Sequence, residues 1–204
     1  MKTRLVTVML GLMLSSSVFG EPQNGEPPKG EPQKGLLIDV FIPLGENLNV
    51  IDWRVGDHAD YQLDMGFFGQ GSVKKRATSE EKDAIWLRAD VQTPMGNQTI
   101  DTLFRRSDGK VLKMLVDGKE HTFEEPDIEI IDQREESVTV PAGTFRAIYV
   151  KVRDRKQQSD TEAWVNPMAI PLGGIAKSTT KKSMLTITME LTAFGRAAVT
   201  LPLP

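Results

Sequence analysis

The stretch VTVPAGTFRAIYVKV, residues 138–152, carries the clearest fold signal in the chain. A run of β-branched residues ends at Pro141-Ala142-Gly143, and an apolar run resumes at Thr144. Proline fixes φ and has no backbone donor, whereas glycine adopts φ values that other residues avoid, so this tripeptide predicts a tight turn between two strands. In the second strand both alternating sets of positions contain apolar residues, which predicts an interior strand with both faces covered.

The same period of two recurs through most of the chain. Residues 59–65, 85–92 and 185–193 alternate apolar with polar side chains, and Asp108-Gly109 and Asp117-Gly118 are typical of hairpin turns. No window has a strong helical period. We therefore expect a mainly β protein, with a single large curved antiparallel sheet of about nine to eleven strands that forms a half-barrel or a barrel.

Residues 1–20 have the pattern of a secretory signal peptide. Lys2 and Arg4 precede an almost wholly apolar run, and small residues lead to Gly20, which predicts cleavage after Gly20 and a periplasmic location. The apolar run is shorter than the about 20 residues of a membrane-spanning helix, so we expect no stable span after cleavage, with a permanent anchor as the alternative. The chain has no cysteine, hence no disulfide and no acylated cysteine.

Residues 21–35 form three tandem pentads, EPQNG, EPPKG and EPQKG. Each pentad contains an acid, proline, polar residues and glycine, and none of these supplies apolar surface to bury. We interpret the segment as a disordered tether, with a leader that has no partner as the alternative. The composition becomes globular from Leu36, so residues 36–204 are predicted to form one β-rich domain.

The charge balance argues against a nucleic-acid partner. The chain has 25 Lys plus Arg against 28 Asp plus Glu, a formal net charge of -3. A nucleic-acid binder needs a basic surface or stripe, and the pairs Arg105-Arg106 and Lys181-Lys182 are too short for that, so we interpret them as solvated strand ends.

No catalytic or cofactor motif emerges from the sequence. There is no cysteine nucleophile and no G-x-S-x-G elbow, and the two histidines, His58 and His121, are far apart in the chain. Asp57, His58 and Asp60 would supply only part of a zinc site, and no second cluster completes it. Isolated glycine pairs without a following helix do not make a phosphate loop. We predict a protein that is not an enzyme and uses no metal or cofactor.

Large apolar side chains provide the candidates for binding. Small-molecule sites are concave and mostly apolar, so the side chains that could wall a ligand groove, or else fill an ordinary core, are Trp86, Phe104, Phe145, Tyr149, Trp164 and Met189. Phe67 and Phe68 are consecutive in a predicted loop, and adjacent residues of a strand point to opposite faces. At least one of the two is therefore predicted to lie at a partner surface.

Three segments together resemble a family of bacterial exported proteins of unknown function. They are VGDHADY at 55–61, VTVPAGTF at 138–145, and WVNP with IPLGG within 164–174; LTAFG at 191–195 fits the same pattern. The fold of that family is similar to the periplasmic lipoprotein-carrier (Lol) superfamily. The resemblance implies a deeply curved sheet whose apolar concave face holds acyl chains or another hydrophobic ligand.

Two departures limit what the resemblance transfers. His58 stands where members often carry an aromatic residue, and the chain lacks the acylated cysteine of the many members that are lipoproteins. The arginine that lipoprotein carriers use as a lid contact cannot be placed by motif, so no functional residue is carried over.

Two functions follow from the sequence. The first is a non-catalytic periplasmic module that binds a hydrophobic ligand, either a lipid or an acylated protein. The alternative is a structural subunit of a multiprotein cell-envelope assembly, in which the sheet contacts protein partners and the tether sets its distance.

Overall fold

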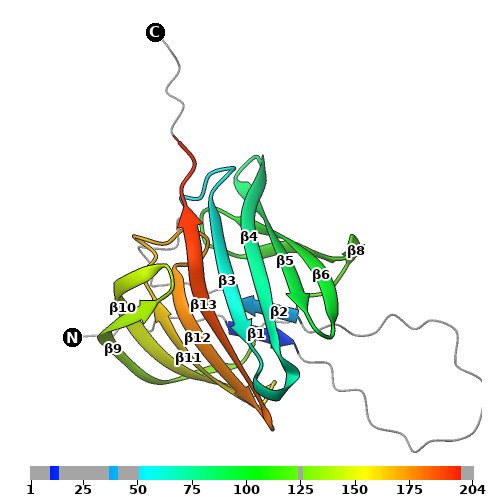
Figure 1. Cartoon of the computed structure of the whole chain (residues 1–204). Coiled ribbons are helices and arrows are strands. Elements are labelled where there is room, and N and C mark those ends of the chain that lie inside the picture. Colours follow the sequence, from blue (N-terminus) through cyan, green and yellow to red (C-terminus); the bar gives the residue numbers. More distant parts are fainter. Residues whose placement is uncertain (1–9, 14–36, 41–50, 124–125, 199–204) are drawn as a thin grey trace, which may run out of the picture.

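The fold is known from a computed structural model, which describes residues 10–13, 37–40, 51–123 and 126–198 (Figure 1). The predicted signal peptide and pentad tether lie outside the described residues, except for Leu10–Met13. That segment forms strand β1, which pairs with β2 (Leu37–Val40) in a separate two-stranded sheet.

An eleven-stranded antiparallel sheet contains the remaining described strands. In chain order they are β3 (His58–Asp64), β4 (Gln70–Glu81), β5 (Ala84–Thr93), β6 (Gly96–Arg105), β7 (Val111–Val116), β8 (Lys119–Glu120), β9 (Ile128–Val140), β10 (Gly143–Asp154), β11 (Ser159–Val165), β12 (Ile175–Lys182) and β13 (Leu185–Gly195). A single 3-10 turn, η1 (Gly66–Phe68), connects β3 to β4. The predicted mainly β fold with one large antiparallel sheet is confirmed, and the sheet does not close into a barrel.

The sheet consists of two meanders joined at their first and last strands. Its order is β8-β7-β6-β5-β4-β3-β13-β12-β11-β10-β9, so each strand of a meander pairs with its sequence neighbour. The meanders meet where β3 pairs with β13, with Tyr61 opposite Leu191 and Leu63 opposite Met189. The edge strands β8 and β9 are consecutive in the chain.

The connection between those edge strands requires the sheet to curve. Neighbouring strands lie about 4.8 Å apart, so a flat sheet of this size would be roughly 48 Å wide. Residues 121–127 connect β8 to β9, and a segment of that length spans at most about 28 Å when fully extended. The two edges must therefore approach each other, and Figure 1 shows the curved, open sheet that results.

The predicted turn at residues 141–142 joins β9 to β10, and Gly143 adopts φ 135, a value that glycine tolerates best. β10 pairs with β9 on one side and β11 on the other, which confirms the predicted interior strand. The turn of this hairpin extends beyond β11 and contacts β13, where the Ala142 N–H donates to the Leu191 carbonyl at 3.0 Å.

The two ends of the sheet differ. At the end where β3 begins, residues 51–53 and 166–174 cover the core: Ile170 and Leu172 are at most 1% exposed, and Trp53 packs edge-on against Phe104. We call this the closed end. The opposite end contains the β3–β4, β5–β6, β10–β11 and β12–β13 turns, and we call it the turn end (Figure 1).

Arg106 attaches the incoming chain at the closed end. Its guanidinium donates to the carbonyls of Ile51 and Trp53 at 2.9 and 2.8 Å and pairs with Glu80 at 2.7 Å. Arg106 is therefore not simply a solvated strand end, as the sequence predicted, but holds a second segment in place. Arg105, by contrast, pairs only with Asp108 on its own turn among the described contacts.

Candidate ligand-binding face and apolar tip

One face of the sheet carries most of the buried side chains, and we call it the inner face. Lys75 of β4 lies at its centre and is only 2% exposed. The residues opposite Lys75 are Ala59 on β3 and Ala89 on β5, so two small side chains flank the long one. The nearby Tyr61 ring lies 5.8 Å from the Lys75 Nζ. An apolar face with a buried cation at its centre is the first candidate site.

The Tyr61 hydroxyl is a buried polar atom on this face with no hydrogen-bond partner within the described residues. Burial raises the pKa of the Tyr61 phenol above its ordinary value, with the Asp60 charge adding to the effect, so the phenol keeps its proton at neutral pH. The Oε1 of Gln98 on β6 is also buried and without a partner. Val73 and Val91 separate these two residues in register across β4 and β5.

The inner face of the second meander combines small and hydroxyl side chains with aliphatic ones such as Val150 and Ile187. Thr161 and Thr180 are buried and share a hydrogen bond of 2.9 Å, and Ala163 lies opposite Ser178. Ser178 is in turn opposite Met189, a predicted groove residue that is 2% exposed. Met189 therefore lies on the inner face as part of the core.

Two other groove candidates lie on the opposite, outer face. The Tyr149 and Trp164 rings pack at a tilt with their centroids 5.1 Å apart, and the Arg134 guanidinium lies 3.8 Å from the centre of the tyrosine ring. The next residues in register are Lys177 and Glu190, which form an ion pair of 2.8 Å. This row of packed and ion-paired side chains crosses five strands of the outer face, from β9 to β13.

The remaining groove candidates are separate from one another. Phe104 is completely buried at the closed end, Phe145 packs against Phe194 at 5.8 Å, and the Trp86 indole donates to Glu81 at 2.7 Å. The structure thus does not gather the six candidates into one groove. Sequence reasoning missed Lys75, although its phase with Val73 and Ala77 on β4 marked it as inward-facing.

Phe67 and Phe68 occupy η1 at the turn end, where they are 99% and 49% exposed. Their rings meet edge-on at 5.9 Å. Strand β13 contacts η1, and the β12–β13 turn at the start of β13 presents Met184, which is fully exposed. These three residues form what we call the apolar tip.

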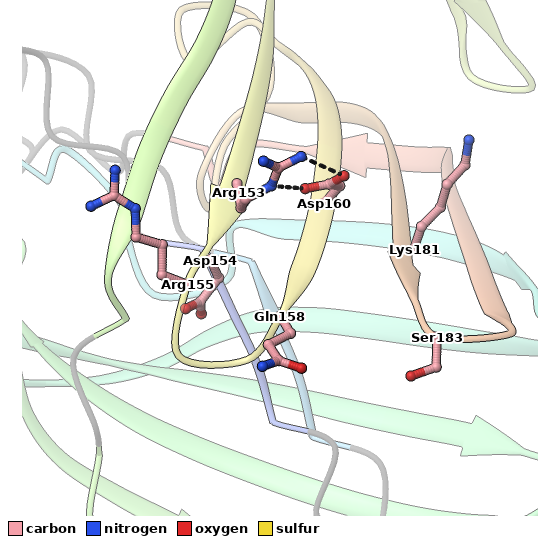
Figure 2. Close-up of a pocket in the computed structure, with 7 residues that line it drawn as sticks. All are labelled: Arg153, Asp154, Arg155, Gln158, Asp160, Lys181 and Ser183. Atoms are coloured by element: carbon pink, nitrogen blue, oxygen red, sulfur yellow. Dashed lines mark hydrogen bonds and ion pairs between the residues drawn. The ribbon is translucent and has the colours of Figure 1, made fainter.

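A pocket of about 490 Å³ lies beside the tip, between the β10–β11 and β12–β13 turns (Figure 2). Arg153 donates to both carboxylate oxygens of Asp160 at 2.8 and 3.3 Å, and its guanidinium holds the pKa of Asp160 below the ordinary value. Asp154 is 2% exposed and accepts the backbone N–H groups of Lys156 and Gln157, which shapes the turn. Most of the pocket's charges therefore already have internal partners.

The acidic residues on either side of His58 stabilise the fold. Asp57 is completely buried and accepts the backbone N–H groups of Arg54 and Ala197 at 3.1 and 2.7 Å, so it connects the two ends of the domain. Asp60 pairs with Arg76 on the neighbouring strand. Within the described ranges, no group of three or more His, Cys, Asp or Glu residues is arranged to hold a metal ion.

A scan against protein-family models and a search of curated proteins find no match for this chain. In the part of the chain that the structure describes, no helix has the length and apolarity needed to cross a membrane.

Proposed function

We propose that this protein is a non-catalytic periplasmic module that binds a hydrophobic ligand, a lipid or the acyl chain of a protein, on the inner face of its curved sheet. The observation that carries the proposal is the unpartnered Tyr61 hydroxyl in the middle of an apolar face. The signal-peptide pattern supports export, and the resemblance to the lipoprotein-carrier superfamily supports this class of ligand.

The physical argument rests on the cost of burying a polar atom. Leaving a buried hydroxyl without a partner costs about 1–3 kcal/mol, so such atoms call for an explanation, of which a bound group is one. Apolar neighbours of Tyr61, such as Leu63, Val73 and Leu191, suit a hydrocarbon chain. The ligand would therefore be amphipathic, with a polar group that hydrogen-bonds Tyr61 and an apolar part along the sheet.

The open seam of the sheet offers a route to this face. β8 and β9 do not pair with each other, so no ladder hydrogen bonds join these two edges of the sheet. Moving the two edges apart breaks no backbone hydrogen bonds between strands, whereas separating any two paired strands breaks them. A ligand would enter along this seam with the sheet intact.

Native mass spectrometry of the full protein, purified from cells that export it, tests the proposal. We expect a bound lipid-sized mass that organic extraction releases, and less of it in Tyr61→Phe. Tyr149→Phe is the matched control, since Tyr149 lies on the outer face. Protein that carries no such mass, and takes up no added fatty acid or lysophospholipid, would contradict the proposal.

The alternative, a structural subunit of an envelope assembly, has one supporting feature. β9 is a thirteen-residue edge strand that pairs only with β10 among the described strands. However, it carries Asp132, Arg134, Glu135 and Glu136 in close succession, and charged edge strands discourage pairing with another chain. We therefore prefer the ligand-binding function.

A further inference from the structure

The turn end presents large apolar side chains with nothing packed over them. Phe67 and Met184 are essentially fully exposed, and Phe68 is half exposed. Met95, on the adjacent β5–β6 turn, is also half exposed. Pro94 places that turn beside η1, because a Cβ on Gly69 would lie 3.1 Å from the proline ring. Exposed apolar groups that cluster in this way mark an interaction site.

The β3–β4 turn holds the two phenylalanines in place. The Met65 N–H donates to the Gly69 carbonyl at 2.9 Å, and the Gly69 N–H donates to the Gly66 carbonyl at 3.0 Å. Asp64 accepts the Gly66 N–H at 2.8 Å. Because the backbone is already ordered, little conformational entropy is lost when the tip meets a partner.

From these contacts we propose that the apolar tip inserts into the surface of an anionic phospholipid bilayer. The size of the patch favours a bilayer over a protein: its side chains expose roughly 500 Å² of apolar surface. A specific protein interface buries about 1,200–2,000 Å² in total and needs a complementary shape. A fluid bilayer accepts protruding side chains without such a shape.

The charges behind the tip indicate the sign of the lipid. Lys181 lies opposite Asp160 in register and makes no hydrogen bond or ion pair within the described part of the chain, and its neighbour Lys182 donates a hydrogen bond to Gln157 at 3.0 Å. Both lysines immediately precede the β12–β13 turn that carries Met184. When the tip inserts, they would lie at the depth of the lipid phosphates, where basic residues attract anionic headgroups.

The acids beside Lys181 have partners of their own. Asp160 is bound to Arg153, and Glu129 pairs with Arg155 at 3.2 Å. The carboxylate of Asp154 is buried at 2% exposure. The accessible charges at the base of the tip are therefore Lys181, before the β12–β13 turn, and Asp64, which accepts the Gly66 N–H at the start of η1.

Membrane docking is separable from ligand binding on the inner face. The tip residues belong to turns, whereas Tyr61 lies within the sheet, so a defect in one need not affect the other. Docking would also give the molecule a defined orientation, with the closed end facing away from the lipid.

Site-specific fluorescence provides the test, because the chain contains no cysteine and a single introduced one can be labelled uniquely. In the full protein, Met184→Cys reports from the tip and Met168→Cys, 80% exposed at the closed end, is the matched control. An environment-sensitive dye at each position is followed during titration with vesicles of phosphatidylcholine alone or in equal mixture with phosphatidylglycerol.

We expect the dye at residue 184 to shift to the blue and brighten on the mixed vesicles, with no change at residue 168. Phe67→Ser with Phe68→Ser, in the Met184→Cys background, should raise the half-saturating lipid concentration at least about tenfold. Lys181→Gln, which removes one positive charge, should raise it about fivefold on mixed vesicles and leave binding to phosphatidylcholine unchanged.

Three outcomes would overturn the proposal. They are no response at residue 184 on either vesicle, an equal response at residue 168, and full binding after loss of both phenylalanines. Equal binding to both lipid compositions would refute the anionic preference. Crosslinking from residue 184 to a protein in cells, without a vesicle response, would assign the tip to a protein partner instead.

Discussion

Replacing Tyr61 by phenylalanine should stabilise the protein. The substitution removes one buried oxygen that has no hydrogen-bond partner in the described structure and leaves the ring in place. An unsatisfied buried hydroxyl costs about 1–3 kcal/mol, so we expect the free energy of unfolding to rise by about 1 kcal/mol once a small packing loss is allowed for. For a domain of this size, that corresponds to an increase in Tm of about 2–4 °C.

The same substitution should change the alkaline limb of the stability curve. Burial raises the pKa of the Tyr61 phenol above its ordinary value of 10.0, so the folded protein keeps a proton that the unfolded chain releases above that pH. The unfolded state then binds fewer protons, and the free energy of unfolding falls as pH rises past about 10. Tyr61→Phe lacks this loss.

Urea unfolding followed by tryptophan fluorescence, at neutral and at alkaline pH, measures both effects. Tyr149→Phe is the control, since its hydroxyl is not among the buried unpartnered atoms. The reasoning would be refuted if Tyr61→Phe lowered the free energy of unfolding by more than about 1 kcal/mol while the slope of that free energy against urea concentration stayed the same. That result would show that the hydroxyl is hydrogen-bonded in solution. If the ligand-binding proposal is right, the variant gains stability and loses ligand.

Two further substitutions test how the fold is held together. Arg106→Ala removes the donors to the Ile51 and Trp53 carbonyls, so we expect the free energy of unfolding to fall by about 2–3 kcal/mol and the tryptophan emission to shift to the red. The control is Arg105→Ala, which should cost under about 1 kcal/mol because its partner Asp108 is on the same exposed turn. Equal urea midpoints for the two variants would contradict this prediction. Glu190→Gln should weaken the dependence of stability on pH in acid. Hydrogen bonds from Lys177 and Gln62 lower the pKa of Glu190 below 4.5. The stability that the Glu190 carboxylate contributes is therefore present above about that pH and is lost as pH falls through the folded-state pKa. Thermal unfolding in acid with the same pH dependence in both proteins would exclude this role.

Much of the strand pattern could be predicted from the sequence. The turn at residues 141–142 and the alternation in residues 185–193 arise from local stereochemistry, because φ preferences and a period of two act over a few residues. The turn at Asp117-Gly118 is of the same kind: both residues have positive φ, 50 and 76, as a type I′ turn requires.

The candidate site was harder to predict, because it depends on which strands become neighbours. Lys75 reads as one more charge in the run Lys74-Lys75-Arg76 until β3 and β5 are known to place alanines beside it. Likewise, the sequence predicts Tyr149 and Trp164 as groove residues, but the pairing of β10 with β11 packs their rings against each other on the outer face.

The sequence by itself determined that this chain forms β-strands joined by tight turns, and that Phe67 and Phe68 fall in one of those turns. Only the tertiary structure decided which strand is opposite which, and therefore which side chains share a face. Strand identity depends on interactions between residues near in sequence, whereas the β3–β13 pairing joins residues about 130 positions apart. That pairing puts Tyr61 inside the sheet, and the β12–β13 turn presents Met184 at the same end of the sheet as the phenylalanines of the tip.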